Sequence, residues 1–333
     1  PLFRYKAMFT KPKLFIPHFQ IRQLLCPLSK NALFYSLLSY DDFNIQRLDP
    51  ETGNVFTVIG ANQIQPMYNR TCVVSSMDVN DDFLVAGCYD GQYIYRTKLN
   101  VGSTGIASGV LSNDTNDMIN HTNIISRSHL PPQVIFSSNE GTVIMLDLKT
   151  NQIINTYQAP DSMNCTSYCP TNPNIKLLQG DFKTSLIIDT NSSDCQRPLL
   201  SLEGQLDFGS ACAWSPRHNY IVATGNQDGF CRIYDLRFVK PNSKPLHSLM
   251  TDYELPVRSM RFDKGGRFLM FAEPVDNVTI LDATTDFKQG QTLNVLGEIA
   301  GIGFNDDADD GQCVSIGIAD TYIGGIMQFS RGN

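Results

Sequence analysis

The sequence predicts an all-β fold, a single seven-bladed β-propeller spanning residues 1–333. Three observations lead to this prediction. An apolar residue followed by Asp recurs at nearly even spacing, and short apolar runs closed by turn residues lie between these pairs. No segment of useful length has the periodicity of a helix. Self-similarity at a period of about 20–50 residues is typical of repeat architectures.

The apolar–Asp pairs mark the end of the third strand in each repeat. The last four of the five Asp residues are 42, 46 and 47 positions apart, and the first gap, of 98, is twice 49. One repeat therefore lacks its Asp, and Thr97 occupies the expected place; a further step falls near Gln328, which makes seven positions. The pairs are Leu48-Asp49, Leu146-Asp147, Ile188-Asp189, Tyr234-Asp235 and Leu281-Asp282.

The expected second strands are short and apolar, as buried strands are. They are Ala32–Tyr40, Asp82–Cys88, Val134–Ser138, Lys176–Gly180, Tyr220–Gly225, Phe268–Ala272 and Cys313–Ile318. The predicted blades span approximately residues 20–60, 71–111, 118–160, 163–204, 207–252, 256–297 and 298–331 plus 2–9. The last blade supplies three strands of its own, so Leu2–Phe9 is expected to be its fourth. This pairing closes the ring and leaves no open sheet edge.

One repeat has the most regular pattern. Its strands and turns are Ala211-Cys-Ala-Trp-Ser-Pro, Tyr220-Ile-Val-Ala-Thr-Gly, Asp228-Gly229 and Cys231-Arg-Ile-Tyr-Asp235. This segment resembles a WD40 repeat, and Tyr234-Asp235 stands where that family carries Trp-Asp. The resemblance implies a platform that binds other proteins.

Composition excludes several classes of function. The formal charge is −7 with no Lys/Arg cluster, so neither nucleic acid nor an anionic membrane is expected as the main partner. No apolar run approaches the ~18 residues of a membrane span. No catalytic motif is present and the five histidines lack metal-ligand spacing, so we expect no enzyme, no metal and no cofactor. Nine scattered cysteines predict reduced core residues and a cytoplasmic or nuclear protein.

Acidic residues recur at the turn into the third strand, and rotation of the blades should place them in a ring on one face. They are Asp42, Asp90, Glu140, Asp181, Asp228, Asp276 and Asp320. Each carboxylate alone is explained by its tight turn, which it can cap. Together they predict a negative face that suits a cationic ligand, such as a free amino terminus.

The loops that enter the first strands open on the same face. They carry Arg22, Asn120 with His121, Asn164, Phe208 and Arg258. Glu273 ends a second strand where the other blades have small or neutral residues. One interpretation is that Glu273 binds a peptide α-amino group. The alternative is an internal salt bridge with Arg258 or Arg261.

The last blade also resembles a particular fungal WD40 family. The residues concerned are Leu296–Phe304, Ile316–Asp320 and Tyr322–Arg331, with Ile119-Asn-His121 and Phe136–Gly141. That family includes the exchangeable substrate receptor of the yeast GID (CTLH-type) ubiquitin ligase. The resemblance implies recognition of N-terminal degrons, with the free N-termini of target proteins and a ligase scaffold subunit as partners. The alternatives are a general scaffold without a terminal-peptide pocket, and a propeller hydrolase or lyase with a metal in its channel.

Overall fold

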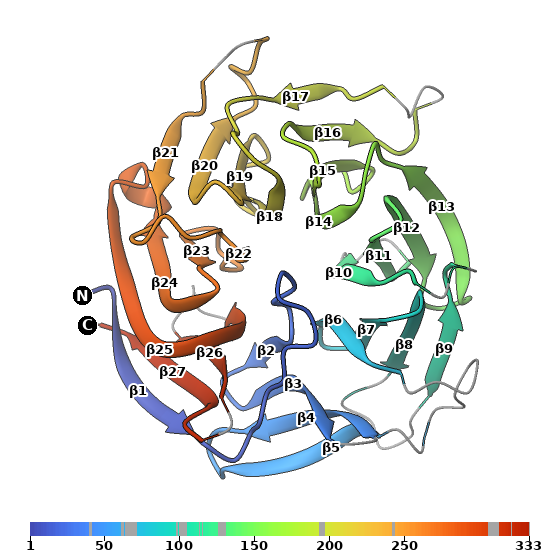
Figure 1. The fold of residues 1–333 in the computed structure, drawn as a ribbon, viewed down its shortest axis with the longest axis vertical. Helices are drawn as coiled ribbons and strands as arrows, with labels where there is room; N and C mark the ends of the chain where they lie inside the picture. Colours follow the sequence, from blue (N-terminus) through green and yellow to red (C-terminus); the bar gives the residue numbers. More distant parts are fainter. Residues whose placement is uncertain are drawn as a thin grey trace.

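The chain folds into seven blades arranged around a central axis (Figure 1). The computed structural model describes residues 1–39, 42–60, 63, 72–97, 99, 105–112, 114, 116–125, 131–192, 197–241, 244–305, 313–320 and 322–332. The all-β prediction is confirmed: among the complete elements that the structure describes, the one helical element is the 3-10 turn η3 (Ala283–Thr285). Within the part of the chain that the structure describes, no helix is long and apolar enough to span a lipid bilayer.

Five blades are separate antiparallel sheets of four strands, each strand paired with the next along the chain. In the first two blades the strands are β2 (Leu25–Ser29), β3 (Ala32–Ser39), β4 (Asp42–Asp49), β5 (Asn54–Gly60), then β6 (Val74–Val79), β7 (Phe83–Cys88), β8 (Gln92–Thr97) and β9 (Ile106–Val110). In the third and fourth they are β10 (Ile119–Ile125), β11 (Gln133–Ser138), β12 (Thr142–Asp147), β13 (Gln152–Gln158), then β14 (Met163–Tyr168), β15 (Ile175–Gly180), β16 (Ser185–Asp189) and β17 (Leu200–Leu202). In the fifth they are β18 (Gly209–Trp214), β19 (Ile221–Asn226), β20 (Phe230–Asp235) and β21 (His247–Met250).

The sixth and seventh blades form one seven-stranded sheet because they share a strand. That strand, β25, runs over sixteen residues, and it bends at Leu296 and Gly297, whose φ angles are 37° and 126°. Its first half pairs with β24 in the sixth blade, and its second half pairs with β26 in the seventh. The strands of this sheet are β22 (Ser259–Phe262), β23 (Phe268–Ala272), β24 (Val275–Asp282), β25 (Gln289–Phe304), β26 (Cys313–Ala319), β27 (Gly325–Arg331) and β1 (Phe3–Phe9).

The predicted closure of the ring by the N-terminal strand is confirmed. β1 pairs antiparallel with β27, with Phe3 opposite Arg331 and Phe9 opposite Ile326. Phe3 is buried, and its ring packs edge-on against Phe268 with centroids 5.3 Å apart. The last blade thus combines the two ends of the described chain, which lie side by side at the rim in Figure 1.

Apolar side chains of the inner strands fill the space between adjacent blades. All eight described cysteines are buried, as expected of small core residues. The segment between β1 and β2 leaves the rim and reaches the middle of the disc (Figure 1). It is held there by Tyr89, whose hydroxyl donates to the Pro17 carbonyl at 3.1 Å, and by the side-chain amide of Gln23. That amide donates to the Thr122 carbonyl at 2.8 Å and accepts from the Thr122 N–H at 3.2 Å.

Candidate functional site

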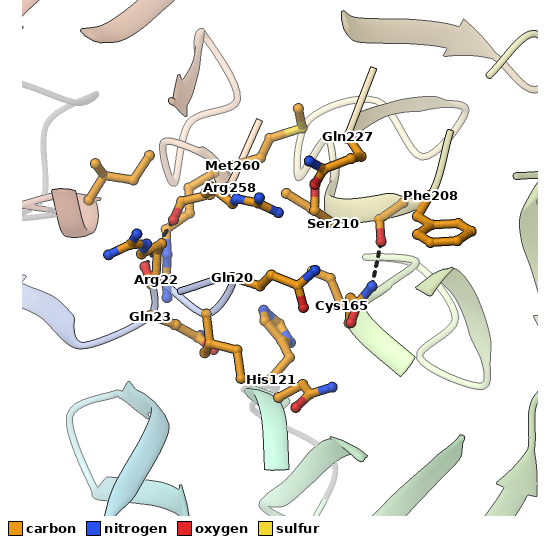
Figure 2. A pocket seen from close by; sticks show the side chains of 18 of the residues that line it. Gln20, Arg22, Gln23, His121, Cys165, Phe208, Ser210, Gln227, Arg258 and Met260 are labelled. Carbon is orange, nitrogen blue, oxygen red and sulfur yellow. Dashed lines mark hydrogen bonds between the residues drawn. The ribbon is translucent and has the colours of Figure 1, made fainter. Parts of the chain in front are cut away.

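A pocket lies at the centre of one face, where the chain enters the first strands of several blades (Figure 2). We call it the central pocket. It is lined by Gln20, Ile21, Arg22, Gln23, Asn120, His121, Asn164, Cys165, Asp181, Phe208, Gly209, Ser210, Ala211, Gln227, Arg258, Ser259, Met260, Arg261 and Ile302. A second pocket continues the channel toward the opposite face, and Gln23, His121, Met260 and Arg261 line both.

A repeated β-bulge builds the wall of the central pocket. In the second to fifth blades, the pairing of the first strand with the second skips one polar residue. The side chain of that residue donates a hydrogen bond to a carbonyl of the next blade. The donors are Ser75, Asn120, Asn164 and Ser210, and their acceptors are the carbonyls of Ile119, Met163, Gly209 and Val257, at 2.6, 2.9, 2.8 and 2.6 Å.

Arg258 occupies the next position in this series, in the sixth blade. Each acceptor carbonyl belongs to the residue just before the next donor, and Val257 precedes Arg258. The Arg258 side chain is only 9% exposed, and its Nε has no hydrogen-bond partner among the described residues. Burial and the nearby charge of Arg22 lower the pKa of the Arg258 guanidinium to about 10. Arginine at this position therefore presents a cation to the pocket, where the second to fifth blades use a neutral side chain to bond the next blade.

Arg22 lies beside Arg258 at the same side of the pocket, and Phe208 lies across from them (Figure 2). The Arg22 side chain is 6% exposed, and its Nε and Nη1 have no hydrogen-bond partner in the described structure. The nearest carboxylate oxygen to Nη1, from Glu298, is 3.9 Å away. Burial, together with the charges of Arg258 and Arg22, lowers the pKa of His18. This corner of the pocket is therefore strongly positive.

Seven of the sequence-predicted residues line the central pocket, namely Arg22, Asn120, His121, Asn164, Asp181, Phe208 and Arg258. Asn120 and Asn164 belong to the bulge series described above. Asp181 is the one carboxylate of the described lining, and it accepts a hydrogen bond of 2.8 Å from Asn164.

The other six predicted residues, five of which lie in turns, do not line the pocket. Asp320 accepts from the backbone N–H groups of Tyr322 and Ile323, both at 2.8 Å, and these bonds lower its pKa. Asp276 has a φ of 63° and accepts from the Gly297 N–H at 2.7 Å. The remaining turn residues are Asp90, at a φ of 57°, Glu140, whose N–H donates to Asp117, and Asp228, which pairs with Arg232 at 2.8 Å. The side chain of Asp42 falls outside the described residues.

The structure corrects the expected sign of charge at the channel mouth. The described lining holds Arg22, Arg258 and Arg261 against a single carboxylate, Asp181. Asp320 accepts from backbone N–H groups of its own turn, Asp276 accepts from the Gly297 N–H of the neighbouring strand, and Asp228 pairs with Arg232; none of the three lines the pocket. A ligand at this pocket therefore meets positive charge, which does not suit the free amine that the sequence predicted.

The structure corrects the interpretation of Glu273 as well. Its side chain is 2% exposed and lies outside the lining of the central pocket, and burial raises its pKa. The expected alternative, a salt bridge with an arginine of the same blade, is also not formed. Among the described residues Glu273 has no ion pair, and Arg261 instead lies 3.6 Å from Asp78 of the second blade.

Gln20, Gln23, Cys165, Gln227 and Arg261 line the pocket but were not predicted as site residues. Alignment of the blades by the polar residue near the start of each first strand would have found the bulge series and its exception at Arg258. No sequence pattern locates Gln20 or Gln23, because they precede β2, the first strand of the first blade. Among the described residues, no group of three His, Cys, Asp or Glu side chains is placed to hold a metal ion.

Comparison with known proteins shows what kind of repeat the blades are. Residues 196–235 match the model of the WD40 family, described as "WD domain, G-beta repeat". The chain carries a WD40 repeat within a WD40-type propeller. A solved chain of the mitotic checkpoint complex superposes over 99% of this chain and 93% of its own length, with a TM-score of 0.73. At 14% identity, that likeness shows the fold alone.

Several curated fungal proteins are similar over part of this WD40 propeller, and each is named ribosome biogenesis protein Ytm1. The protein of Pyricularia oryzae is 27% identical over 153 residues, which are 44% of this chain and 32% of the relative. That of Neurospora crassa is 25% identical over 182 residues, covering 52% and 36%, and that of Chaetomium thermophilum is 27% identical over 116, covering 34% and 23%. The matched part of the chain thus spans about a third or less of the length of these relatives.

These relatives overturn the predicted ubiquitin-ligase receptor, together with its N-degron ligand and its ligase scaffold partner. The structure explains why the last blade misled. A Cβ on Gly301 would lie 2.7 Å from the Leu25 backbone nitrogen, and one on Gly303 would lie 2.4 Å from Cδ of Pro27. The Gly-rich pattern of Leu296–Phe304 therefore serves close packing of the seventh blade against the first. The pattern is explained by packing within the fold and does not identify a binding partner.

Proposed function

We propose that this chain is a WD40 scaffold that assembles proteins during ribosome biogenesis and performs no chemistry of its own. The observation that carries the proposal is the shared name of the similar fungal proteins, each a ribosome biogenesis protein. Ribosome assembly would place the protein in the nucleus, and in the nucleolus in particular. Its partners would be protein components of assembling ribosomal particles.

The exposed apolar side chains support a scaffold that works through the face bearing the central pocket. The loops into the first strands and the turns between second and third strands open on this face. They carry large apolar side chains that are 43–90% exposed. Exposed apolar residues that gather on one face of a soluble protein mark an interaction site. These residues are Phe15, Phe19, Leu206, Phe208, Tyr253, Leu296, Tyr322 and Ile323.

Phe208 belongs both to these exposed side chains and to the lining of the central pocket, and we propose that the pocket contributes to the same protein contact. Asn120, His121, Asn164, Asp181, Phe208 and Arg258 would then contact the partner. The turn residues Asp90, Glu140, Asp228, Asp276 and Asp320 would shape the loops around it, and Glu273 would support the sixth blade from within.

Sedimentation of the tagged full-length protein through a sucrose gradient tests the proposal. We expect the protein from its native cells to sediment with ribosomal precursor particles, and its depletion to cause precursor ribosomal RNA to accumulate. The triple variant Leu206→Ser, Phe208→Ser, Tyr253→Ser should lose most of this co-sedimentation. A protein that sediments alone, with normal ribosomal RNA processing after depletion, would overturn the proposal.

A matched control separates loss of a specific surface from loss of apolar area in general. Ile153, Ile154 and Leu246 are each 49% exposed and lie in or next to the outer strands β13 and β21, away from the pocket. The variant Ile153→Ser, Ile154→Ser, Leu246→Ser removes three exposed apolar side chains as well. It should sediment as the unaltered protein does, and an equal loss in both variants would contradict a role for the pocket face.

A further inference from the structure

The central pocket contains cationic N–H donors that have no hydrogen-bond acceptor among the described residues. Nε of Arg258 and both Nε and Nη1 of Arg22 make no hydrogen bond among the described residues, although the two side chains are at least nine-tenths buried. A buried, unpaired charged donor is costly, because it loses water without gaining a partner. Two such arginines side by side also repel each other, and this repulsion contributes to the lowered pKa of Arg258. An anion between them would remove both costs.

The position of Arg258 shows that the cation departs from a repeated design. Ser75, Asn120, Asn164 and Ser210 occupy the equivalent place in four blades, and each uses its side chain to bond the next blade. The Arg258 side chain makes no such bond to the next blade, and its Nε has no hydrogen-bond partner among the described residues at the pocket. A neutral side chain would serve the fold at this place, so stability of the propeller does not require a guanidinium here.

The surroundings favour a carboxylate over a more highly charged anion. Asp181 lines the same pocket, and its charge would repel a doubly charged phosphate group more strongly than a singly charged carboxylate. The Glu298 carboxylate already lies 3.9 Å from Arg22, too far for a hydrogen bond, and its side chain is 59% exposed. Ile21, Phe208 and Met260 add apolar surface against which the neighbouring side chains of a peptide can pack.

We propose that the central pocket binds a carboxylate from an acidic segment of a partner protein, held between Arg22 and Arg258. The planar guanidinium groups offer forked N–H donors that match the two oxygens of a carboxylate. This inference rests on the proposed scaffold function for the nature of its ligand, a protein. It adds that the two guanidinium groups select an acidic segment of the partner protein.

Calorimetric titration of the full chain with hexaglutamate, acetylated and amidated so that only side-chain carboxylates are charged, tests the inference. We expect binding at low ionic strength that hexaglutamine does not show. Arg258→Gln and Arg22→Gln should each weaken it by about tenfold or more. Arg258→Lys should restore part of the affinity, because it keeps the charge and loses the forked geometry. Thermal unfolding of each variant establishes that the propeller still folds.

Arg217→Gln is the matched control. Arg217 is exposed in the turn between β18 and β19, which opens on the opposite face, so this variant changes the net charge equally. It should bind hexaglutamate as the unaltered chain does. Absence of hexaglutamate binding, equal binding by Arg258→Gln, or Arg258-dependent binding of inorganic phosphate or single-stranded RNA in place of hexaglutamate would overturn the inference.

The two proposals fail in different experiments. A chain that does not bind hexaglutamate but sediments with ribosomal precursors would refute the carboxylate site without contradicting the scaffold function. A chain that binds hexaglutamate through both arginines but sediments alone would refute the scaffold and leave the carboxylate site standing.

Discussion

Asn120 donates a hydrogen bond of 2.9 Å from Nδ2 to the carbonyl of Met163, and so joins the third blade to the fourth at the edge of the central pocket. Asn164 repeats this bond toward the fifth blade, to Gly209 at 2.8 Å, and adds a bond to Asp181. The same residues therefore shape the pocket and connect neighbouring sheets.

Removing one of these bonds should destabilise the propeller, because it leaves a buried carbonyl without its donor. We expect Asn120→Ala to lower the free energy of unfolding by about 1–3 kcal/mol, measured by urea denaturation. Asn164→Ala should cost at least as much, since it also deprives Asp181 of a donor. Asn191→Ala, at an exposed turn, is the control and should cost less than about 0.5 kcal/mol. Equal effects at Asn120 and Asn191 would show that the inter-blade bond contributes nothing.

The closure of the ring depends on a reciprocal pair of hydrogen bonds to β1. Gln291 accepts from the Phe3 N–H at 2.7 Å and donates to the Phe3 carbonyl at 2.9 Å. Gln291→Ala should lower the free energy of unfolding by about 1–3 kcal/mol and speed amide hydrogen exchange in β1. Gln289→Ala, exposed at the start of the same strand, should change neither. Unaltered exchange in β1 of the Gln291 variant would contradict this role.

Lys176 should make stability depend on pH above neutrality. It is fully buried, and burial lowers its pKa to about 7, an effect that the charge of Asp189 partly offsets. In the unfolded chain this proton is lost only at a pH of about 10. Between pH 7 and about 10 the unfolded chain therefore binds more protons than the folded chain, and the free energy of unfolding rises with pH.

The Lys176→Met variant should lack this rise. The free energy of unfolding of the variant, relative to that of the unaltered chain, should therefore fall between pH 7 and 9. Urea denaturation at each pH measures the difference. Lys149→Met, at an exposed site, should parallel the unaltered chain; a constant difference for Lys176→Met would refute the prediction.

Asp228 and Arg232 form a buried ion pair of 2.8 Å, with side chains 6% and 4% exposed. Burial alone would raise the pKa of Asp228, but hydrogen bonds from Arg232 and from two backbone N–H groups lower it. Asp228→Asn should destabilise by about 3–5 kcal/mol, because it leaves the Arg232 charge buried without its partner. The double variant Asp228→Leu, Arg232→Met should recover much of that loss. An equally unstable double variant would show that the pair is not the cause.

The same ion pair predicts acid sensitivity in this blade. Because the folded pKa of Asp228 is lowered, its stabilising effect is present above the unfolded value of about 3.9 and is lost as pH falls through the folded value. Unfolding curves collected at decreasing pH below about 4 should therefore converge for the unaltered chain and Asp228→Asn. Curves that stay equally far apart throughout would contradict this assignment.

The sequence predicts the architecture well because each blade repeats one pattern of apolar strands and turns. The expected second strands begin and end within one residue of the observed bounds, apart from Tyr40, which falls outside the described residues. The shared strand β25 was not predicted. Leu296-Gly297 has the composition of a turn, and only the pairing of both halves with neighbouring strands shows that the strand continues through it.

The charge of the site could not be predicted from residue types. Periodicity places carboxylates at the turns, but it does not show that Asp276 bonds the Gly297 N–H of the neighbouring strand or that Asp320 bonds N–H groups of its own turn. The positive corner comes from Arg22, which precedes the first strand of the first blade, and Arg258, which precedes the first strand of the sixth. The two arginines are far apart in the sequence and come together only when the ring closes, so no local sequence pattern could have predicted their proximity.

β25 also constrains how this propeller could have changed in evolution. Repeat proteins gain or lose units most simply at boundaries where one unit ends before the next begins. The boundary between the sixth and seventh blades has no such gap, because a single strand belongs to both sheets. Duplication or deletion of a blade there would have to divide a paired strand, which the junctions between the separate four-stranded sheets would not require.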